Sequence, residues 1–264
     1  MTRARDARGS ELLQRHGLAL PALALAALVK LHYSVASAEE LRWILAPTSM
    51  LTGLVTRAEF AFYPGEGYLS REHSVLVSPA CAGVNFAIVA FVSLVLAFGP
   101  QLSGWARRSA WLAAACALAY VATVAVNVLR ISLSIEVAHL AAQTLGFTFQ
   151  SVHRLIGIVV YVAGLFALCL MAQIWLSSRS KSQSGASIGK AATLAVALVC
   201  YAGVTLGIPL ARGAAHNPDY WSHAAPVSVV VGAVLSLLFA ARGRNWDDRR
   251  HARRPSERSE RVTP

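Results

Sequence analysis

Three residue types that can carry out acyl transfer are spread along this apolar chain: a cysteine, an arginine and a histidine. Cys81 lies in SPACAGVNF, Arg130 lies in NVLRI and His153 lies in HRLIG. A cysteine thiolate can attack a carbonyl carbon, a histidine can take and return the proton, and an arginine can stabilise the oxyanion. Whether the three act together depends on the elements that position them.

Cys81 stands at the start of a long apolar run, in a context that predicts a helix N-terminus. Ser78 is a favoured N-cap residue and Pro79 suits the first helical position, so Cys81 is expected in the first turn. The positive end of a helix favours an anionic thiolate, which is the reactive form. The other cysteines lie inside apolar runs, where packing is the simpler explanation. They are Cys116, Cys169 and Cys200.

Arg130 and His153 are also expected near helix ends. An arginine in a membrane span either snorkels to the interface or faces a polar interior, and Asn127 one turn earlier favours the polar interior. Ser151 can cap the next helix, which puts His153 in its first turn, where the helix end favours a neutral imidazole. A lone interfacial histidine is more simply a polar anchor. Gly157, one turn on, allows a neighbouring helix to approach closely.

The composition predicts a membrane protein. Of 264 residues, 56% are hydrophobic and only 14% are charged, and the mean hydropathy is positive. The net charge is +11, but the basic residues lie in short clusters between apolar runs. Nucleic-acid binding, which needs a continuous basic face, is therefore not expected.

Apolar stretches of about 18 residues or more are long enough to cross a bilayer. Six are predicted, at 18–38, 82–99, 111–132, 155–176, 190–210 and 224–241. The fold class expected is an all-α polytopic membrane protein. The first stretch is interpreted as an anchor rather than a cleaved signal, because it contains Lys30 and no small-residue cleavage site precedes a soluble domain.

Basic clusters predict the orientation in the membrane. The N-terminus, the region near residue 107, the segment 179–190 and the C-terminal tail hold most of the 24 Lys and Arg residues. Because short cytoplasmic loops retain basic residues, both termini are expected in the cytoplasm. Cys81, Arg130 and His153 then lie at the extracytoplasmic ends of three consecutive spans.

The segment between the first two spans is expected on that same outer surface. WILAPTSMLTGLVT, residues 43–56, contains Pro47 and is too short to span, so it predicts an interfacial or re-entrant helix. Aromatic residues, the turn Pro64–Gly67 and a strand Val75–Val77 follow, which predict a small hairpin or extended loop that leads to Cys81.

The three short motifs together carry a resemblance. Cys81 in SPACAGVNF, Arg130 in NVLRI and His153 in HRLIG resemble the motifs of the exosortase and archaeosortase family, membrane-embedded cysteine transpeptidases. The resemblance covers about residues 18–176, including the short helix and the hairpin-like loop. The size of this core resembles the compact exosortase K type.

With this resemblance the chain divides into four regions. They are a basic cytoplasmic N-terminus (1–17), an exosortase-like membrane core (18–176), an accessory two-span region (177–241) and a basic, disordered cytoplasmic tail (242–264).

The resemblance implies a role for each motif residue. Cys81 would be the nucleophile, His153 the base and Arg130 the group that stabilises the oxyanion. The supporting candidates are Gly83, Asn127 and Arg154. The substrates implied are membrane-anchored proteins with C-terminal sorting signals, cleaved and transferred at the extracytoplasmic face of the bacterial cytoplasmic (inner) membrane.

Other assignments remain open on the sequence alone. His139 is an alternative base, and its pairing with Glu136 has metal-ligand spacing, but two ligands do not make a zinc site. No Walker, Rossmann or HExxH pattern occurs, so neither a metal nor a cofactor is expected. His73, His216 and His223 are expected in solvated loops. The competing functions are a transporter, a non-catalytic membrane anchor or assembly factor, and a lipid acyltransferase.

Overall fold

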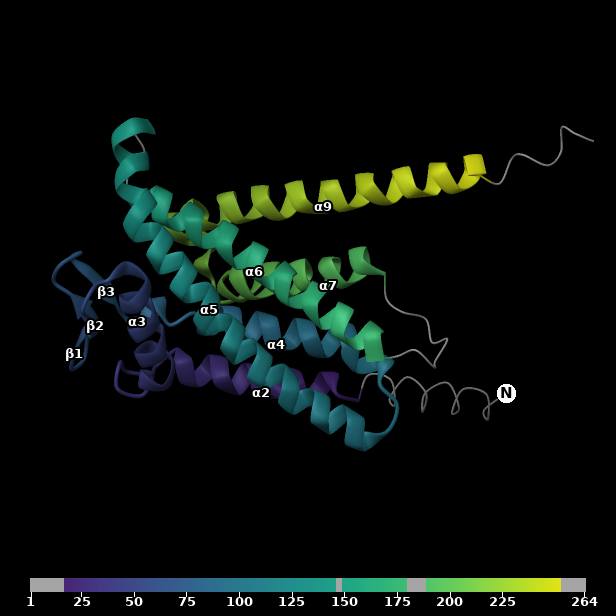
Figure 1. Ribbon diagram of the computed structural model, residues 1–264, viewed down its shortest axis with the longest axis horizontal. Coiled ribbons are helices and arrows are strands. Elements are labelled where there is room, and N and C mark those ends of the chain that lie inside the picture. The colour runs from purple at the N-terminus through teal and green to yellow at the C-terminus, as the bar shows by residue number, and fades with distance from the viewer. Residues whose placement is uncertain (1–16, 146–148, 180–188, 253–264) are drawn as a thin grey trace, which may run out of the picture.

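The computed structural model describes residues 17–145, 149–179 and 189–252, and most of these residues are helical (Figure 1). Five segments of this part are long and apolar enough to cross a membrane. They are Pro79–Gln101, Trp105–Val137, Val152–Ser178, Ala191–Ala211 and Tyr220–Leu238. Each overlaps a predicted span, which confirms a predominantly helical chain with membrane-spanning character. The count of six spans stays a prediction.

The first predicted span, 18–38, forms a shorter apolar helix, α2 (Ala19–Tyr33). Its 15 residues extend over about 22 Å, which is less than the roughly 30 Å of a hydrocarbon core. Lys30 of α2 does not lie free among apolar groups, because its Nζ donates to Asn85 Oδ1 at 2.6 Å.

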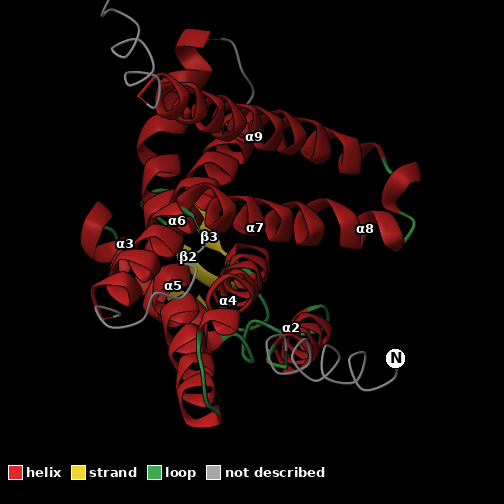
Figure 2. Cartoon of the chain, turned by 90° about the vertical axis from the view of Figure 1, so that its right-hand side faces the viewer, coloured by secondary structure: helices red, strands yellow, loops and turns green. Residues whose placement is uncertain are grey.

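The central helix is α4 (Val84–Phe98). It packs against α2, α5 (Trp105–Leu145), α6 (Phe149–Arg179) and α7 (Lys190–Ala202) (Figure 2). A helix surrounded in this way must be apolar on every face, and the sequence VNFAIVAFVSLVLAF meets that requirement.

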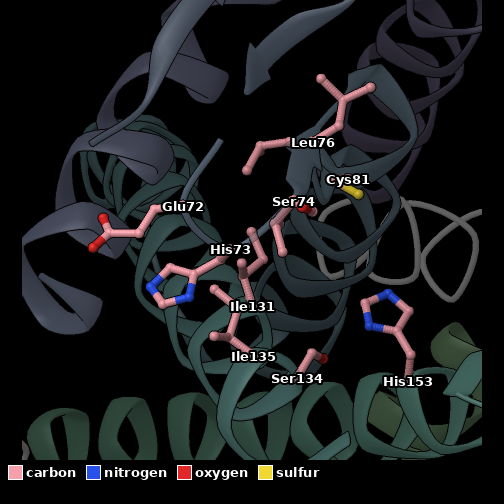
Figure 3. A pocket seen from close by; sticks show the side chains of 11 residues that line it. Glu72, His73, Ser74, Leu76, Cys81, Ile131, Ser134, Ile135 and His153 are labelled. Carbon is pink, nitrogen blue, oxygen red and sulfur yellow. The ribbon is translucent and has the colours of Figure 1, made fainter. Parts of the chain in front are cut away.

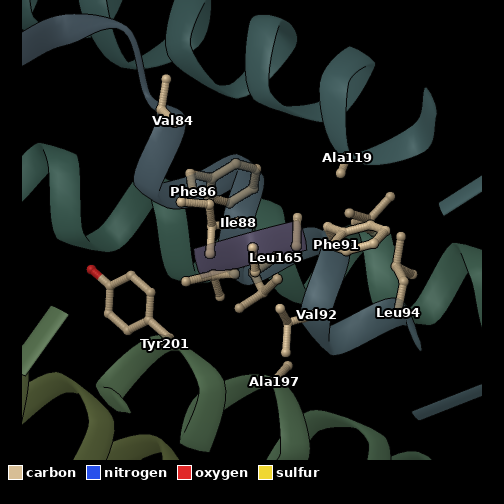
Figure 4. Packing of buried hydrophobic residues seen from close by; sticks show 14 of the residues in the cluster. Val84, Phe86, Ile88, Phe91, Val92, Leu94, Ala119, Leu165, Ala197 and Tyr201 are labelled. Carbon is tan, nitrogen blue, oxygen red and sulfur yellow. The ribbon is translucent and has the colours of Figure 1, made fainter. Parts of the chain in front are cut away.

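The apolar core follows the length of α4. Phe86, Phe91 and Val92 of α4 are buried, as are Leu165 of α6 and Ala197 of α7, and the close-up shows them gathered around the central helix (Figure 4). Burying a side chain of the size of valine, leucine or phenylalanine stabilises a fold by about 1.5–3 kcal/mol.

The C-terminal helices are added to one side of this core. α7 continues through a π-helical turn, Gly203–Gly207, into the short α8 (Ile208–Ala211), and α9 (Pro218–Ala252) then runs back along the bundle. α9 contacts α6 and α7.

The short segment with Pro47 forms α3 (Arg42–Thr56), at one end of the bundle (Figure 1). Its buried face contains Ile44 and Leu45, whereas Met50 and Leu54 are exposed on the other side. A short helix with exposed apolar side chains is what an interfacial helix requires, and α3 is not among the membrane-crossing segments of the described residues.

The expected hairpin is present and gains a third strand. β1 (Ala61–Tyr63), β2 (Gly67–Ser70) and β3 (Val75–Val77) form an antiparallel sheet in the order β1-β2-β3. Tyr68 is opposite Val77 and Ser70 is opposite Val75. Gly67 has a φ of +125°, and a Cβ there would collide with the Val77 carbonyl oxygen, so this position requires glycine.

The sheet and α3 lie together at one end of the helix bundle (Figure 1). The start of α2 and the end of α9 both lie at the opposite end. Glu39, just before α3, accepts a hydrogen bond from the Gly65 N–H at 2.7 Å and so holds the β1–β2 turn. This contact lowers the pKa of Glu39.

Candidate active site

Cys81 lies in a 3₁₀ turn, Pro79–Cys81, that precedes α4. Cys81 is therefore in the first helical turn of its span, as expected, but this turn is separate from the α-helix, because Gly83 adopts a left-handed conformation (φ +72°) and α4 begins only at Val84. The Ser78 side chain makes no capping bond. Instead the Ser78 carbonyl accepts the Cys81 N–H at 2.8 Å.

Two neighbouring helices hold this turn in place. Tyr33 of α2 donates its hydroxyl to the Pro79 carbonyl at 3.1 Å, and Asn127 Nδ2 of α5 donates to the Cys81 carbonyl. The backbone that carries the thiol is thus fixed on both sides. Asn127, proposed from sequence as a marker of a polar face, acts as a direct support.

Gly83 allows that support to come close. A Cβ at Gly83 would lie 3.1 Å from both Asn127 Nδ2 and Thr123 Cγ2. The left-handed φ adds a second reason for glycine, since other residues pay about 1 kcal/mol or more there. Gly83 therefore sets both the direction of the chain and its distance from α5.

Arg130 was expected near the end of its helix, but α5 continues to Leu145. Arg130 lies inside the bundle and does not snorkel outward. Its Nη1 donates to the Tyr161 hydroxyl at 2.6 Å, and its Nη2 lies 3.3 Å from His153 Nε2. The guanidinium also lies near enough to the Cys81 thiol to interact with it electrostatically. Gly157 opens the space, because a Cβ there would approach Arg130 Nε to 3.4 Å.

His153 was expected in the first turn of a helix capped by Ser151, but α6 begins at Phe149, so Ser151 lies inside the helix and His153 in its second turn. A guanidinium has only donors, so a hydrogen bond from Arg130 to His153 Nε2 needs the neutral imidazole as its acceptor. The neutral imidazole is also the form that a general base requires.

Tyr161 is a site residue that sequence reasoning missed. Its hydroxyl accepts from Arg130 and donates to Asn127 Oδ1 at 3.0 Å, which links the arginine to the amide that supports Cys81. Its ring lies 5.2 Å from the ring of Phe86. The sequence contained a pattern that could have predicted this role. Tyr161 follows His153 by two helical turns, with Gly157 between them, so the three residues share one face of the helix.

A cavity of about 680 Å³ opens beside the thiol. Figure 3 shows Cys81 and His153 on one side of it and Glu72 and His73 on the other. The rest of its lining comes from the segment that contains β3 and from α5. These residues are Ser74, Val75, Leu76, Val77, Ile131, Ser134 and Ile135.

A second cavity, of about 270 Å³, also reaches His153. Arg130 and Tyr161 line it, and the C-terminal helices add Tyr201, Thr205 and His223. His153 lines both cavities. The expectation of a solvated loop is wrong for His223, which lies in the helix α9 and lines this cavity. His73 lies in the turn between β2 and β3, where a loop was expected, and lines the larger cavity.

Arg154 takes a different position from the other candidates. It lines the second cavity, and its Nη1 donates to Ser222 Oγ of α9 at 2.6 Å. It joins α6 to α9 rather than supporting the Cys81 turn. His139 falls on α5, but its side chain lies outside the part of the chain that the structure describes.

The residues that the structure describes do not form a metal-binding site. Among the residues that the structure describes, no group of three or more His, Cys, Asp and Glu side chains could hold a metal ion.

Comparisons with known protein families, with curated proteins and with solved structures found no match for this chain. Cys81 and His153 line the larger cavity, whereas Arg130 and His153 line the smaller one, so His153 is the residue that the two cavities share.

Proposed function

We propose that this protein is a membrane-embedded cysteine transpeptidase of the exosortase type. It would cleave C-terminal sorting signals of membrane-anchored proteins and transfer the cleaved chain to an acceptor. The observation that carries the proposal is the contact of Arg130 with His153 Nε2, together with the hydrogen bonds that connect Arg130 through Tyr161 and Asn127 to the carbonyl of Cys81, a residue that lines a peptide-sized cavity with His153.

The chemistry follows from these three groups. His153 takes the proton of the Cys81 thiol, and the thiolate attacks the substrate carbonyl, so that a C–S bond forms and the oxygen becomes negative. Arg130 stabilises that charge. Collapse breaks the C–N bond, the leaving amine takes the proton from His153, and a thioester remains on Cys81.

The second half of the reaction releases the product. An acceptor amine or hydroxyl attacks the thioester, His153 takes its proton, and the thiolate leaves and is reprotonated. The smaller cavity also reaches His153 and Arg130, the base and the group that stabilises the oxyanion in this reaction.

The proposed cellular side rests on charge and arrangement. The basic clusters predict cytoplasmic termini, and the start of α2 and the end of α9 lie at the end of the bundle far from the sheet (Figure 1). The sheet, the larger cavity and Cys81 would then face the extracytoplasmic side of the bacterial cytoplasmic membrane. Substrates anchored by a C-terminal helix would present their cleavage site at that depth.

The test is a comparison of Cys81→Ala and Cys81→Ser with Cys116→Ala in the native host. Cys116 is an exposed thiol away from both cavities and serves as the matched control. We expect membrane proteins with a C-terminal helix and basic tail to accumulate uncleaved in both Cys81 variants only, as measured by gel shift and by mass spectrometry of their C-termini. Unchanged processing at normal protein levels would leave Cys81 as a packing thiol and favour the anchor or transporter.

The mass of the adduct on Cys81 separates peptide transfer from lipid acyl transfer. Both reactions pass through a thioester that hydroxylamine cleaves. A transpeptidase carries a peptide fragment on Cys81, whereas a lipid acyltransferase carries a fatty acyl chain. A fatty acyl adduct would overturn the proposed substrate class while retaining the nucleophile.

A further inference from the structure

The larger cavity has a strand along one wall, and that strand is at the edge of its sheet. β3 pairs with β2 on one side, and within the described residues no strand pairs with its other side. An edge strand presents unpaired N–H and C=O groups that can pair with another extended chain. We infer that the open edge of β3 binds the substrate peptide as a fourth strand beside Cys81, an inference that rests on the proposed function.

The direction of the backbone groups identifies which residue would pair. A Cβ on Gly67 of β2 would meet the Val77 carbonyl oxygen, so that carbonyl points toward β2. Backbone groups alternate sides along a strand, so the groups of Val75 also point toward β2 and those of Leu76 point to the open edge. Leu76 is therefore the residue whose N–H and C=O are available to a peptide.

The position of this edge suits a substrate of the Cys81 thiol. The residues from Glu72 to Val77 line the same cavity as Cys81, and only Ser78, Pro79 and Ala80 separate β3 from the thiol along the chain. A peptide aligned with β3 would present successive carbonyls along that wall. The cavity of about 680 Å³ falls within the range of ordinary ligand sites.

Strand addition also explains how one site can bind C-terminal sorting signals of different sequence. Main-chain hydrogen bonds provide affinity that is independent of sequence, and pockets for alternate side chains provide specificity. Ile131 and Ile135 of α5 also line the cavity, so the substrate side chains that face α5 should be small or apolar. Glu72 and His73, at the far side from Cys81, are the polar groups available to residues farther from the scissile bond (Figure 3).

The probe is a peptide reagent that reports on Cys81 directly. N-acetyl-trialanine chloromethyl ketone alkylates a thiolate, with a C–S bond formed and chloride released, and chloroacetone is the matched reagent without a peptide. The full-length protein is treated in detergent or nanodiscs, and alkylation of Cys81 and of Cys116 is followed by mass spectrometry. We expect the peptide reagent to modify Cys81 at least about tenfold faster than chloroacetone, with no such preference at Cys116.

Leu76→Pro removes the outward N–H and leaves the pairing with β2 intact. Proline is tolerated at edge positions whose N–H faces away from the sheet, so this variant should fold. It should lose the preference for the peptide reagent, whereas Leu76→Val, which keeps the N–H, should retain it. Val75→Pro should instead lower the thermal stability, because its N–H faces β2.

A second experiment uses the wild-type protein and changes only the peptide reagent. Peptide reagents N-methylated at one amide at a time cannot form the corresponding strand bond, and at least one should react with wild-type Cys81 about tenfold more slowly than the parent. Equal rates for all methylated reagents, or an unchanged preference in a folded Leu76→Pro protein, would overturn strand addition. So would equal rates for the peptide reagent and chloroacetone.

The two proposals fail separately. If native processing stops in Cys81→Ala but continues at the wild-type rate in Leu76→Pro, the transpeptidase proposal stands and strand addition is wrong. If processing is unchanged in Cys81→Ala, the proposed function itself is wrong. Concentration-dependent dimers that protect the β3 edge would show that a second copy of the chain occupies it, which would also overturn the inference.

Discussion

The helices that carry the candidate site and the C-terminal helices differ in how much of each is buried by protein. In the most apolar stretch of each span, 78% of the residues are buried in Pro79–Gln101, 39% in Val152–Ser178 and 28% in Trp105–Val137, against 22% in Ala191–Ala211 and 11% in Tyr220–Leu238. The first value belongs to a helix surrounded by protein, and the last to a helix that has most of its surface available to lipid. The difference predicts where substitutions should matter.

Polar groups follow the same division. Asn127, Arg130 and Tyr161 bond to one another in the interior of the core. On the C-terminal side, Arg154 bonds to Ser222, which is exposed. Buried polar networks have no water to replace a lost partner, so each member should be costly to change, whereas exposed pairs contribute little. The chemistry should depend on the core, and the C-terminal helices should supply only one wall of the smaller cavity.

A matched pair of arginines gives the largest expected contrast. Arg130→Lys replaces a planar group that contacts Tyr161 and His153 by a single charge, and we expect the processing rate to fall by about 100-fold or more. Arg154→Lys should change it by less than about threefold. The measurement is the rate of substrate cleavage at equal protein levels. Equal losses in the two variants would remove the distinction between the regions.

A pair of tyrosines tests the hydrogen-bond network itself. Tyr161→Phe removes the hydroxyl between Arg130 and Asn127, and we expect about a tenfold lower cleavage rate together with a lower melting temperature, because both partners lose a hydrogen bond. Tyr201→Phe, in the wall formed by α7, should stay within about twofold of wild type. A Tyr161→Phe protein with full activity would show that Arg130 does not need this partner.

Two glycines test the fold around Cys81. Gly83→Ala forces a side chain into a left-handed position 3.1 Å from Asn127 Nδ2, and we expect a loss of about 1–3 kcal/mol in stability. Gly203, with helical φ and no neighbouring atom within 4 Å of an added Cβ, should accept alanine at no cost. Thermal unfolding in detergent measures both. A Gly83→Ala protein as stable as Gly203→Ala would contradict the tight packing of the Cys81 turn.

The smallest effect is expected at the sheet, outside both helical regions. The Gly65 N–H lowers the pKa of Glu39 from its ordinary value of 4.5. The ionised group therefore stabilises the folded turn at pH above 4.5, and this contribution is lost as the pH falls through the lowered pKa. Proteolysis of the β1–β2 turn should speed up in that acidic range, and Glu39→Gln should abolish the dependence. A Glu66→Gln control should keep it.

Several features of the site followed directly from the pattern of residues. Apolar runs separated by basic clusters predicted helices, and Asn127 one turn before Arg130 predicted a polar interior face. The short segment with Pro47 predicted a helix that does not span, and the Gly and Pro residues after it predicted the turn of a hairpin. These are local properties, because periodicity, length and turn chemistry act over a few residues.

Other features required the packing of distant segments. Ser78 and Pro79 suggested an ordinary helix start, yet the chain breaks at Gly83 because Asn127 and Thr123 occupy the space where a side chain would lie. In the sequence Tyr161 is one more residue of an apolar span. Only the fold shows that its hydroxyl forms hydrogen bonds with Arg130 and Asn127.

The sequence by itself determined that this chain is apolar, helical and supplied with a thiol, a guanidinium and an imidazole in three separate apolar segments. Only the tertiary structure decided that the guanidinium contacts the imidazole, that a cavity opens beside the imidazole and the thiol, and that β3 lines it. The physical reason is distance along the chain. Cys81, Arg130 and His153 belong to different helices, and no local rule of turns or periodicity sets the depth at which those helices pack.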